Sequence, residues 1–235
     1  MPGLLSDNRT YGRRRGHSLR PARQALVDRL LPRLTLELPG VGQLDTERLK
    51  DGAREIWLEI GFGAGEHLVV LAERHPEVRF IGCEPYLNGV ASLLRQVQER
   101  GLDNIRLIHG DARPLLAVLP EACLSRVIYL FADPWPKKRH HKRRFICREN
   151  LDALARVLVS GGDFRFASDH GEYARWTLAR VLRHGAFVWP ARSVDDWFRR
   201  PDDWPGTRYE AKALAAGRQP HYFRFLRCRR TQVSS

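Results

Sequence analysis

The feature that most constrains the fold is a repeated change of hydrophobic period between residues 56 and 227. Short, nearly continuous apolar segments alternate with longer segments whose apolar residues recur at helical spacing. Strands buried on both faces are typically continuous apolar runs, whereas helices that cover a sheet carry an apolar stripe. The alternation therefore predicts an α/β domain with helices on both faces of a mostly parallel sheet.

The same pattern places the individual elements. Strands are expected at residues 56–60, 78–85, 104–111, 126–134, 163–169, 186–190 and 221–230. Helices are expected at residues 20–34, 65–76, 87–101, 150–162 and 171–185, with Pro32 and the pair Gly161–Gly162 as helix ends. Residues 190–220 are expected to be irregular. We predict a single domain over residues 21–235, preceded by a flexible basic arm over residues 1–20.

The charge balance restricts the partners. Forty Lys and Arg residues against 27 Asp and Glu give a formal net charge of +13, which favours a polyanionic partner such as nucleic acid. No apolar segment is long enough for a signal peptide or a membrane span, so no membrane contact and a cytoplasmic location are expected. The four cysteines lack metal-ligand spacing, and no metal site is predicted.

A glycine-rich turn follows the first expected strand. Gly61, Gly63 and Gly65 lie where a parallel sheet binds ligands, and glycine lets the backbone approach a ligand closely. The spacing G-x-G-x-G differs from the dinucleotide fingerprint G-x-G-x-x-G. Glu59 precedes the turn, where a carboxylate would repel a pyrophosphate but attract a cation. The amino and sulfonium groups of S-adenosylmethionine are such cations.

Two further acids end the next two expected strands. Glu84 stands where a carboxylate can bind both ribose hydroxyls of an adenosine, and Asp111 stands where one can contact the adenine edge. Over residues 56–169 this set resembles the class I S-adenosylmethionine-dependent methyltransferases. That resemblance implies a Rossmann-like fold: a seven-stranded, mostly parallel sheet with the last strand antiparallel.

A dense cationic stretch, "FADPWPKKRHHKRR", follows the fourth expected strand. Asp133 stands at its beginning, close to where the transferable methyl group would lie. Trp135 can stack on a base, which contributes about 1–3 kcal/mol. The cations that follow are suited to binding RNA phosphates: Lys137, Lys138, Arg139, Lys142, Arg143 and Arg144.

With "DPWPKKRHHKRR", "SDH", "TRYE" and the N-terminal "GRRRGHSLRPARQALVDRLLPRL", the chain resembles the tRNA (guanine-N7)-methyltransferases of the bacterial single-chain type. The resemblance runs over nearly the whole chain. It implies that a guanosine in the tRNA variable loop is methylated at N7, that Asp133 is the catalytic residue, and that Glu59, Glu84, Asp111 and Asp133 contact the cofactor. The implied substrate-contacting residues are Lys137, Asp169, Thr207, Arg208, Tyr209 and Glu210. The implied RNA-contacting residues are Arg139, His140, His141, Lys142, Arg143 and Arg144.

The chemistry agrees with this resemblance. Guanine N7 carries an in-plane lone pair and no proton, so attack on a sulfonium methyl group needs no general base. We therefore expect Asp133 to orient the base and stabilise its developing positive charge rather than to remove a proton. The residues alone do not select N7 over another atom. The alternatives are methylation of another RNA atom or of a small molecule, a nicotinamide-dependent oxidoreductase, and a non-catalytic RNA-binding module. No obligate protein partner is expected, and both a monomer and a homodimer remain open.

Overall fold

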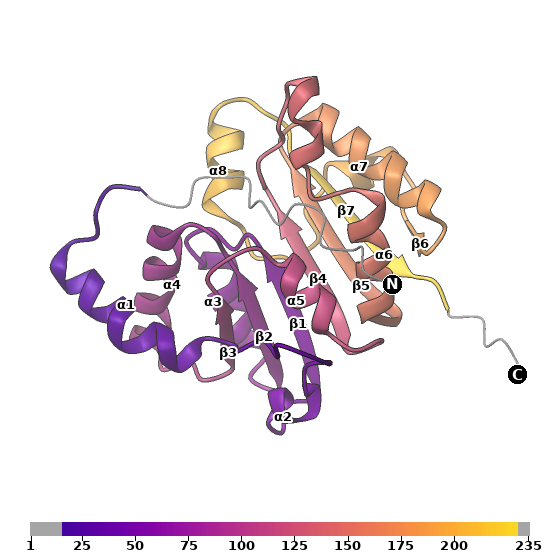
Figure 1. Cartoon of the computed structure of the whole chain (residues 1–235). Coiled ribbons are helices and arrows are strands. Elements are labelled where there is room, and N and C mark those ends of the chain that lie inside the picture. The colour runs from indigo at the N-terminus through magenta and orange to yellow at the C-terminus, as the bar shows by residue number, and fades with distance from the viewer. Residues whose placement is uncertain (1–15, 230–235) are drawn as a thin grey trace, which may run out of the picture.

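The computed structural model describes residues 16–229, and its elements alternate as expected (Figure 1). The strands are β1 (Glu55–Ile60), β2 (Val78–Cys83), β3 (Ile105–Ile108), β4 (Leu124–Leu130), β5 (Leu158–Ser168), β6 (Phe187–Val188) and β7 (His221–Arg227). The α-helices are α1 (Pro21–Leu34), α2 (Thr46–Lys50), α3 (Glu66–Arg74), α4 (Leu87–Arg100), α5 (Arg113–Val118), α6 (Arg148–Val157), α7 (Gly171–His184) and α8 (Arg208–Ala215). Two short 3₁₀ helices are η1 (Lys138–Arg143) and η2 (Val194–Trp197).

The strands form one seven-stranded sheet in the order β3-β2-β1-β4-β5-β7-β6. Neighbours from β3 to β5 pair in parallel, whereas β7 pairs antiparallel with both β5 and β6. The predicted seven-stranded sheet with an antiparallel last strand is therefore confirmed. The order reverses between β1 and β4, and ligands of open parallel sheets bind beyond the strand ends at such a reversal.

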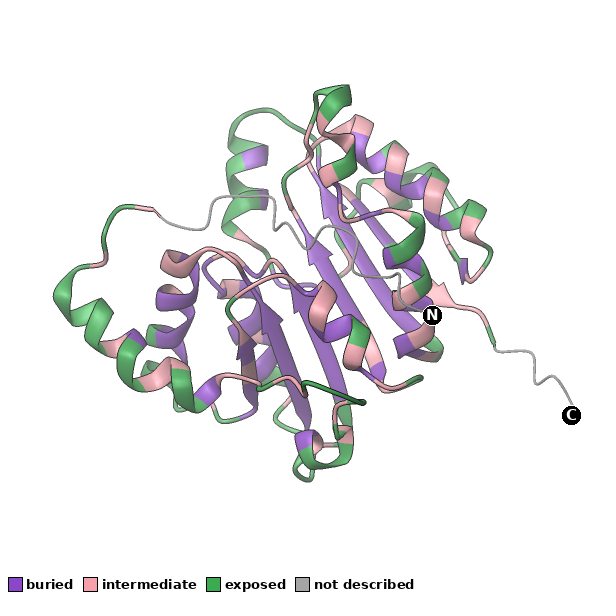
Figure 2. Cartoon of the chain, in the orientation of Figure 1, coloured by how far each residue is buried: buried purple, intermediate pink, exposed green. Residues whose placement is uncertain are grey.

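Two apolar clusters, one on each face, hold the helices to the sheet (Figure 2). One cluster joins α5, α6 and α7 to the strands, and the other joins α1, α3 and α4. Helix α4 shows the sequence logic, because Val90, Leu93, Leu94 and Val97 form a buried stripe. The helix ends where Gly101 takes a φ of +65°, as the sequence predicted.

Two expected helix ends are wrong. Pro32 lies inside α1, which continues to Leu34, because a proline in the last turn removes only one hydrogen bond and Thr35 still closes the turn onto Leu31. The Gly161–Gly162 pair lies within β5, which begins at Leu158 directly after α6. Gly161 has a φ of +78°, and the pairing with β4 shifts register there, so the glycines form a bulge rather than a helix stop.

The segment expected to be irregular, residues 190–220, contains η2 and α8. Trp204 from this segment is buried in the same apolar cluster as α3 and α4, and Trp197 packs against the opposite cluster. The segment thus passes from one face of the sheet to the other near β7. The basic arm expected over residues 1–20 lies mostly outside the described residues. Its described end contacts α4, where Asn88 accepts from the Gly16 N–H and donates to the His17 carbonyl. No helix of the described residues is long and apolar enough to cross a membrane.

Candidate active site

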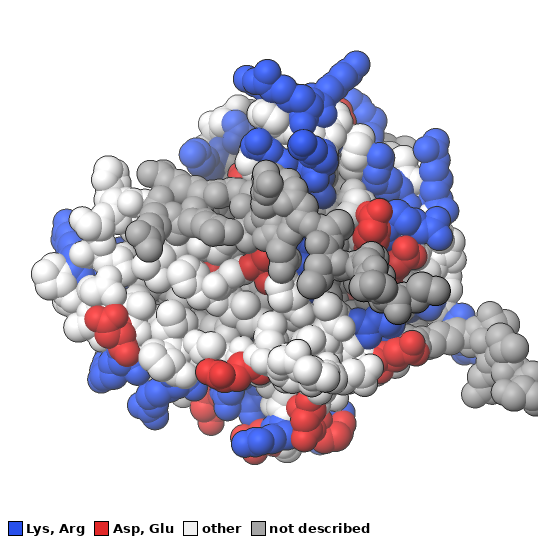
Figure 3. All heavy atoms as spheres, viewed as in Figure 1, with Lys and Arg blue, Asp and Glu red and all other residues white. Residues whose placement is uncertain are grey.

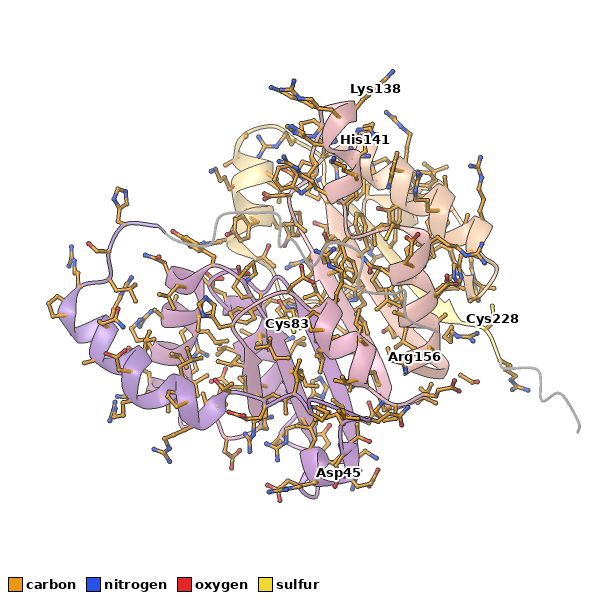
Figure 4. All side chains as sticks on the ribbon, in the orientation of Figure 1. Asp45, Cys83, Lys138, His141, Arg156 and Cys228 are labelled. Atoms are coloured by element: carbon orange, nitrogen blue, oxygen red, sulfur yellow. The ribbon has the colours of Figure 1, made fainter. Side chains whose placement is uncertain are left out.

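A cavity of about 380 Å³ opens beyond the ends of β1, β2 and β4. Its walls combine the turn after β1, the residues after β2 and β3, the turn after β4, and one residue of α8. The lining side chains that carry polar groups are Cys83, Glu84, Tyr86, Asp111, Arg113, Tyr129, Asp133, Trp135, Arg143, Arg144 and Tyr209. In Figure 4, Cys83 marks this region from the end of β2, below the protruding η1 segment.

The turn after β1 brings backbone, not side chains, to the cavity. Gly61 and Gly63 line it with φ values of +73° and +59°, which non-glycine residues rarely adopt. No atom lies within 4 Å of where a Cβ of Gly61 would stand. A side chain there would occupy space that a ligand can use. The turn therefore keeps one wall of the cavity open to a ligand.

Glu84 organises this wall. Its Oε2 accepts from the Gly63 N–H at 2.8 Å, and its Oε1 accepts from the Tyr86 N–H at 2.8 Å. The carboxylate is buried, and this burial raises the pKa of Glu84 above its ordinary value, with the nearby Asp133 and Glu59 charges acting in the same direction. A buried carboxylate in the cavity wall that already binds two N–H groups is suited to accept from ligand hydroxyls.

Two residues predicted to contact the cofactor lie behind the wall. Among the described residues, Glu59 and Gly65 are not part of the cavity lining. Glu59 is buried, and its Oε2 lies 2.9 Å from Nδ1 of the buried His67. A Cβ at Gly65 would lie 2.6 Å from a Leu93 methyl group, so this glycine is required for packing α3 against α4.

Asp111 lines the cavity after β3, with its carboxylate engaged by a neighbour. Both oxygens accept from Arg113, at 2.8 Å from Nε and 2.7 Å from Nη2. Arg113 and Tyr86 both line the cavity, and neither was among the residues predicted for the site. Tyr86 follows Glu84 by two positions, and Arg113 follows Asp111 by two positions. This spacing from a predicted acid is the sequence signal that could have identified both residues.

Asp133 stands on the cavity wall at the end of β4, and its side chain is exposed. The turn that carries it is strained, because Phe131 and Trp135 have φ values of +50° and +45°. Bulky residues with positive φ are outliers that a structure maintains by surrounding contacts, and they cluster at functional sites. The Asp133 carboxylate thus lies on a distorted turn, accessible from the cavity.

The "TRYE" segment begins α8 and positions an aromatic residue over the glycine turn. Thr207 and Glu210 form a reciprocal capping box, in which Thr207 Oγ1 accepts from the Glu210 N–H and Glu210 Oε2 accepts from the Thr207 N–H. Glu210 also accepts from the Tyr222 hydroxyl of β7. Tyr209 lines the cavity, and its ring would lie 3.0 Å from a Cβ on Gly63. Of the four residues of this segment, all predicted to contact substrate, only Tyr209 is among the described residues that line the cavity.

Replacing Thr207 by valine should lower the free energy of unfolding by about 1 kcal/mol, because α8 loses its capping hydroxyl. The same change should loosen Tyr209 over the glycine turn and raise the KM for the ligand that binds in the cavity. Thermal unfolding and steady-state kinetics measure the two effects. Thr207→Ser, which keeps the hydroxyl, is the matched control, and an equal loss in both variants would contradict the capping role.

The remaining predicted substrate contacts lie outside the cavity lining. Asp169 accepts from Arg218 Nε at 2.7 Å, which ties the end of β5 to the segment after α8. Arg208 lies 3.7 Å from the Glu66 carboxylate, and its guanidinium stacks on the Tyr209 ring. Lys137 is exposed directly before η1. None of these three is among the described residues that line the cavity.

The cationic stretch forms η1, above the cavity mouth. Figure 3 shows Lys and Arg side chains gathered at this end of the molecule, and Figure 4 shows Lys138 extending outward from η1. Trp135 lies beneath, with the Arg143 guanidinium 4.8 Å from its ring centre and the His140 ring edge-on. Desolvation and the surrounding cations lower the pKa of His140, which favours its neutral form.

Arg144 does not fit the predicted RNA-contacting surface. Its side chain is fully buried, and its Nη2 lies 2.5 Å from Glu172 Oε2. A guanidinium with no exposed surface and a paired charge cannot reach a phosphate from this position. The physical reason is position: Arg144 follows η1 and is buried, whereas Lys137, Lys138, Arg139 and Lys142 are exposed and Arg143 is half-buried over Trp135.

Comparison with known proteins agrees with this geometry. The family described as "Putative methyltransferase" matches residues 53–222. A tRNA (guanine-N(7)-)-methyltransferase of Rhodospirillum rubrum is 52% identical over 94% of this chain and 88% of its own length. One from Chelativorans sp. is 50% identical over 92% of this chain and 94% of its own length. A 16S rRNA methyltransferase, KamB, has the same fold with a TM-score of 0.57, 14% identity, and coverage of 82% of this chain and 95% of its own.

The sheet order, the cavity at the strand ends and these relatives lead to one classification. The fold is that of the class I methyltransferases. With half of its residues identical to those relatives over almost its full length, the chain belongs to the tRNA (guanine-N(7)-)-methyltransferase family.

Proposed function

We propose that this chain transfers a methyl group from S-adenosylmethionine to N7 of a guanine in the variable loop of tRNA. The observation that carries the proposal is the turn from Phe131 to Trp135. It lines the cavity with an exposed carboxylate, and it leads directly into the cationic η1 surface. One short segment thus connects a small-molecule cavity to a surface suited to RNA. The relatives named for this reaction support the same substrate.

The residues around the cavity fit an adenosyl cofactor. Glu84 is suited to accept from the two ribose hydroxyls, and the open backbone of Gly61 and Gly63 leaves room beside it. Asp111, oriented by Arg113, is suited to the adenine edge. S-adenosylmethionine supplies a methyl group activated by a sulfonium charge. Glu59 lies outside the cavity lining beside His67, so we propose that its negative charge attracts the cofactor's amino group without direct contact.

We propose that Asp133 serves the acceptor base. Its exposed carboxylate can accept hydrogen bonds from the guanine N1–H and amino group, which fixes the ring in the cavity mouth. As N7 gains the methyl group, positive charge develops on the purine, and the carboxylate stabilises that charge. No proton needs to be removed from N7. Trp135 is suited to stack on the base or on a neighbouring one.

The RNA must deliver its base to this position. A variable-loop nucleotide is held by tertiary contacts, so the guanine is turned out of its stack before reaction. We propose that η1 grips the flanking phosphates through Lys137, Lys138, Arg139, Lys142 and Arg143, and that the basic arm tracks the RNA backbone. A cytoplasmic location, where tRNA is present, belongs to this proposal.

Incubating the protein with unmodified tRNA and S-adenosylmethionine labelled in its methyl group tests the function directly. We expect label in 7-methylguanosine after nucleoside digestion. Label in another nucleoside would select the alternative of a different RNA atom. Tight tRNA binding without methyl transfer would select the non-catalytic RNA-binding module. A separate melting experiment tests the nicotinamide-dependent alternative: S-adenosylhomocysteine should raise the melting temperature of the protein, whereas NAD should not.

Replacing Lys142 by glutamine should reduce the salt dependence of tRNA binding. Each lost phosphate contact lowers the slope of log K against log[salt] by about 0.7–0.9. Arg48→Gln is the matched control, because Arg48 is an exposed cation on α2 at the opposite end of the molecule (Figure 1). Titrations at several salt concentrations measure both slopes. Equal slopes for the two variants would argue against η1 as a phosphate-binding surface.

A further inference from the structure

Arg144 is buried in the middle of a site that otherwise presents cations to solvent. Its Nε donates to the Pro134 carbonyl at 2.8 Å, and its Nη2 donates to the Trp135 carbonyl at 3.3 Å. The same guanidinium forms two hydrogen bonds with the Glu172 carboxylate, at 3.0 Å from Nη1 to Oε1 and 2.5 Å from Nη2 to Oε2. One planar group therefore holds the carbonyls of the two residues that directly follow Asp133.

The environment of Arg144 keeps it in this position. Its guanidinium lies 5.0 Å from the Tyr173 ring centre and 4.6 Å from the Trp176 ring centre, both on α7. Glu172 stands in the first turn of the same helix, where an acidic residue is favoured by the helix dipole. The hydrogen bonds from Arg144 lower the pKa of Glu172, so this partner stays ionised well below neutral pH. Helix α7 thus provides a rigid base for the guanidinium.

The segment that Arg144 holds is strained on both sides of Asp133. Phe131, two residues before, and Trp135, two residues after, both have positive φ values. Such residues are disfavoured by roughly 1–3 kcal/mol each and persist only when surrounding contacts enforce them. The Phe131 N–H is held by the Ala167 carbonyl of β5, and the Trp135 carbonyl is held by Arg144. The strand β5 thus holds the Phe131 end of the turn, and Arg144 with its partner Glu172 holds the Trp135 end.

We propose that Arg144, anchored by Glu172, is a positioning residue that holds the strained turn and thereby sets the place of the Asp133 carboxylate at the acceptor site. This inference rests on the proposed function and assigns to Arg144 a role different from RNA contact. The six cations of the stretch then divide by position. Those before Arg144 bind phosphate from outside, and Arg144 binds backbone carbonyls from inside.

Arg144→Lys is the most informative variant. It keeps the positive charge, but one ammonium group cannot reproduce the planar fork that reaches two carbonyls and a carboxylate. We expect kcat at saturating tRNA and S-adenosylmethionine to fall by about tenfold to a hundredfold, as a misplaced catalytic group does. The salt slope of tRNA binding should stay at the wild-type value. Wild-type kcat in a folded Arg144→Lys protein would overturn the proposal.

The salt slope separates positioning from RNA contact. Arg144→Gln removes the charge, and as a positioning residue it should leave the slope unchanged while kcat falls. Lys142→Gln is the matched variant with the opposite expected result: the slope of log K against log[salt] should fall by about 0.7–0.9. A reduced slope for Arg144→Gln, together with normal kcat at saturating tRNA, would show that Arg144 contacts phosphate and would overturn the proposal.

Glu172→Gln tests the anchor even if the Arg144 variants do not fold. If Glu172 anchors a positioning residue, its neutral isostere should lower kcat several-fold without strengthening tRNA binding. If Glu172 merely restrains an RNA-binding arginine, the same change should strengthen tRNA binding and leave kcat normal, which would contradict the proposal. The proposed function fails separately, because it requires wild-type protein and the Arg48→Gln control to methylate tRNA.

Discussion

Replacing Asp133 by asparagine should lower kcat for tRNA methylation by about two to three orders of magnitude. This is the range found when one group that stabilises transition-state charge is removed from an enzyme. Asparagine keeps the shape of the side chain on the cavity wall but removes the charge that would face the methylated purine. Single-turnover methylation of tRNA under saturating S-adenosylmethionine measures the effect without interference from product release.

The fold should tolerate this change. The Asp133 charge contributes to the raised pKa of Glu84, so its removal relieves repulsion within the cavity and should leave the melting temperature equal or higher. Asp103→Asn, an exposed acid at the opposite end of the sheet before β3, is the control and should react at the wild-type rate. Asp133→Asn turning over tRNA as fast as that control would show that the carboxylate has no catalytic role.

Replacing Glu84 by glutamine should weaken S-adenosylhomocysteine binding by about a hundredfold. Hydrogen bonds to a charged group are worth about 1.5–3 kcal/mol each, and an ionised carboxylate has acceptor sites left for ligand hydroxyls beyond the two N–H groups it already binds. Glutamine offers one acceptor oxygen and an unwanted donor toward the Gly63 and Tyr86 N–H groups. Calorimetric titration of both proteins measures the change, and unchanged affinity would contradict the ribose-binding role.

The same carboxylate should make cofactor affinity depend on pH. Burial raises the pKa of Glu84 above its ordinary value of 4.5, so in the native protein it takes up a proton at a higher pH than in the unfolded chain. Lowering the pH from about 7 toward 4.5 therefore converts the acceptor to its neutral form and weakens binding. For this group alone, the same protonation removes the penalty of a buried charge and favours the folded state.

The control for that pH dependence is the Glu84→Gln protein, which has no proton to gain at this position. Its weaker affinity should vary less than the wild-type affinity over the same pH window. Parallel pH profiles for the two proteins would mean that another cavity group is responsible.

The sheet and its helices were predictable because they follow from local hydrophobic period. Strands β1 to β4 and helices α3 and α4 were expected within a few residues, since apolar runs and helical stripes record burial directly. The short helix α5 between β3 and β4 was not predicted. The errors occurred where a local signal has two structural meanings. A glycine pair can end a helix or form a bulge, and only the pairing of β5 with β4 selects the bulge. Helix α8 was missed because its eight residues lie in a polar segment stabilised by tertiary packing of Trp204.

The place of the cavity was also predictable, from the acids at the strand ends. Acids that end successive parallel strands must meet at one edge of the sheet, so Glu84, Asp111 and Asp133 were placed correctly at one cavity. Glu59 was not, because it lies within β1 and its carboxylate contacts His67 on α3 instead of the cavity. Sequence position at a strand end specifies the neighbourhood of a side chain but not which of its neighbours it contacts.

By itself, the sequence determined the fold class, the edge of the sheet at which the cavity lies, and the cationic surface beside it. These depend on period, strand order and net charge, which short stretches of chain encode. The tertiary structure alone decided which of the similar cations are exposed and that Arg144 is buried. In "KKRHHKRR" the arginines 143 and 144 are adjacent and chemically identical, yet only Arg144 meets Glu172, Tyr173 and Trp176 on α7. That distinction arises from a helix that begins 27 residues later in the chain, so no local pattern could contain it.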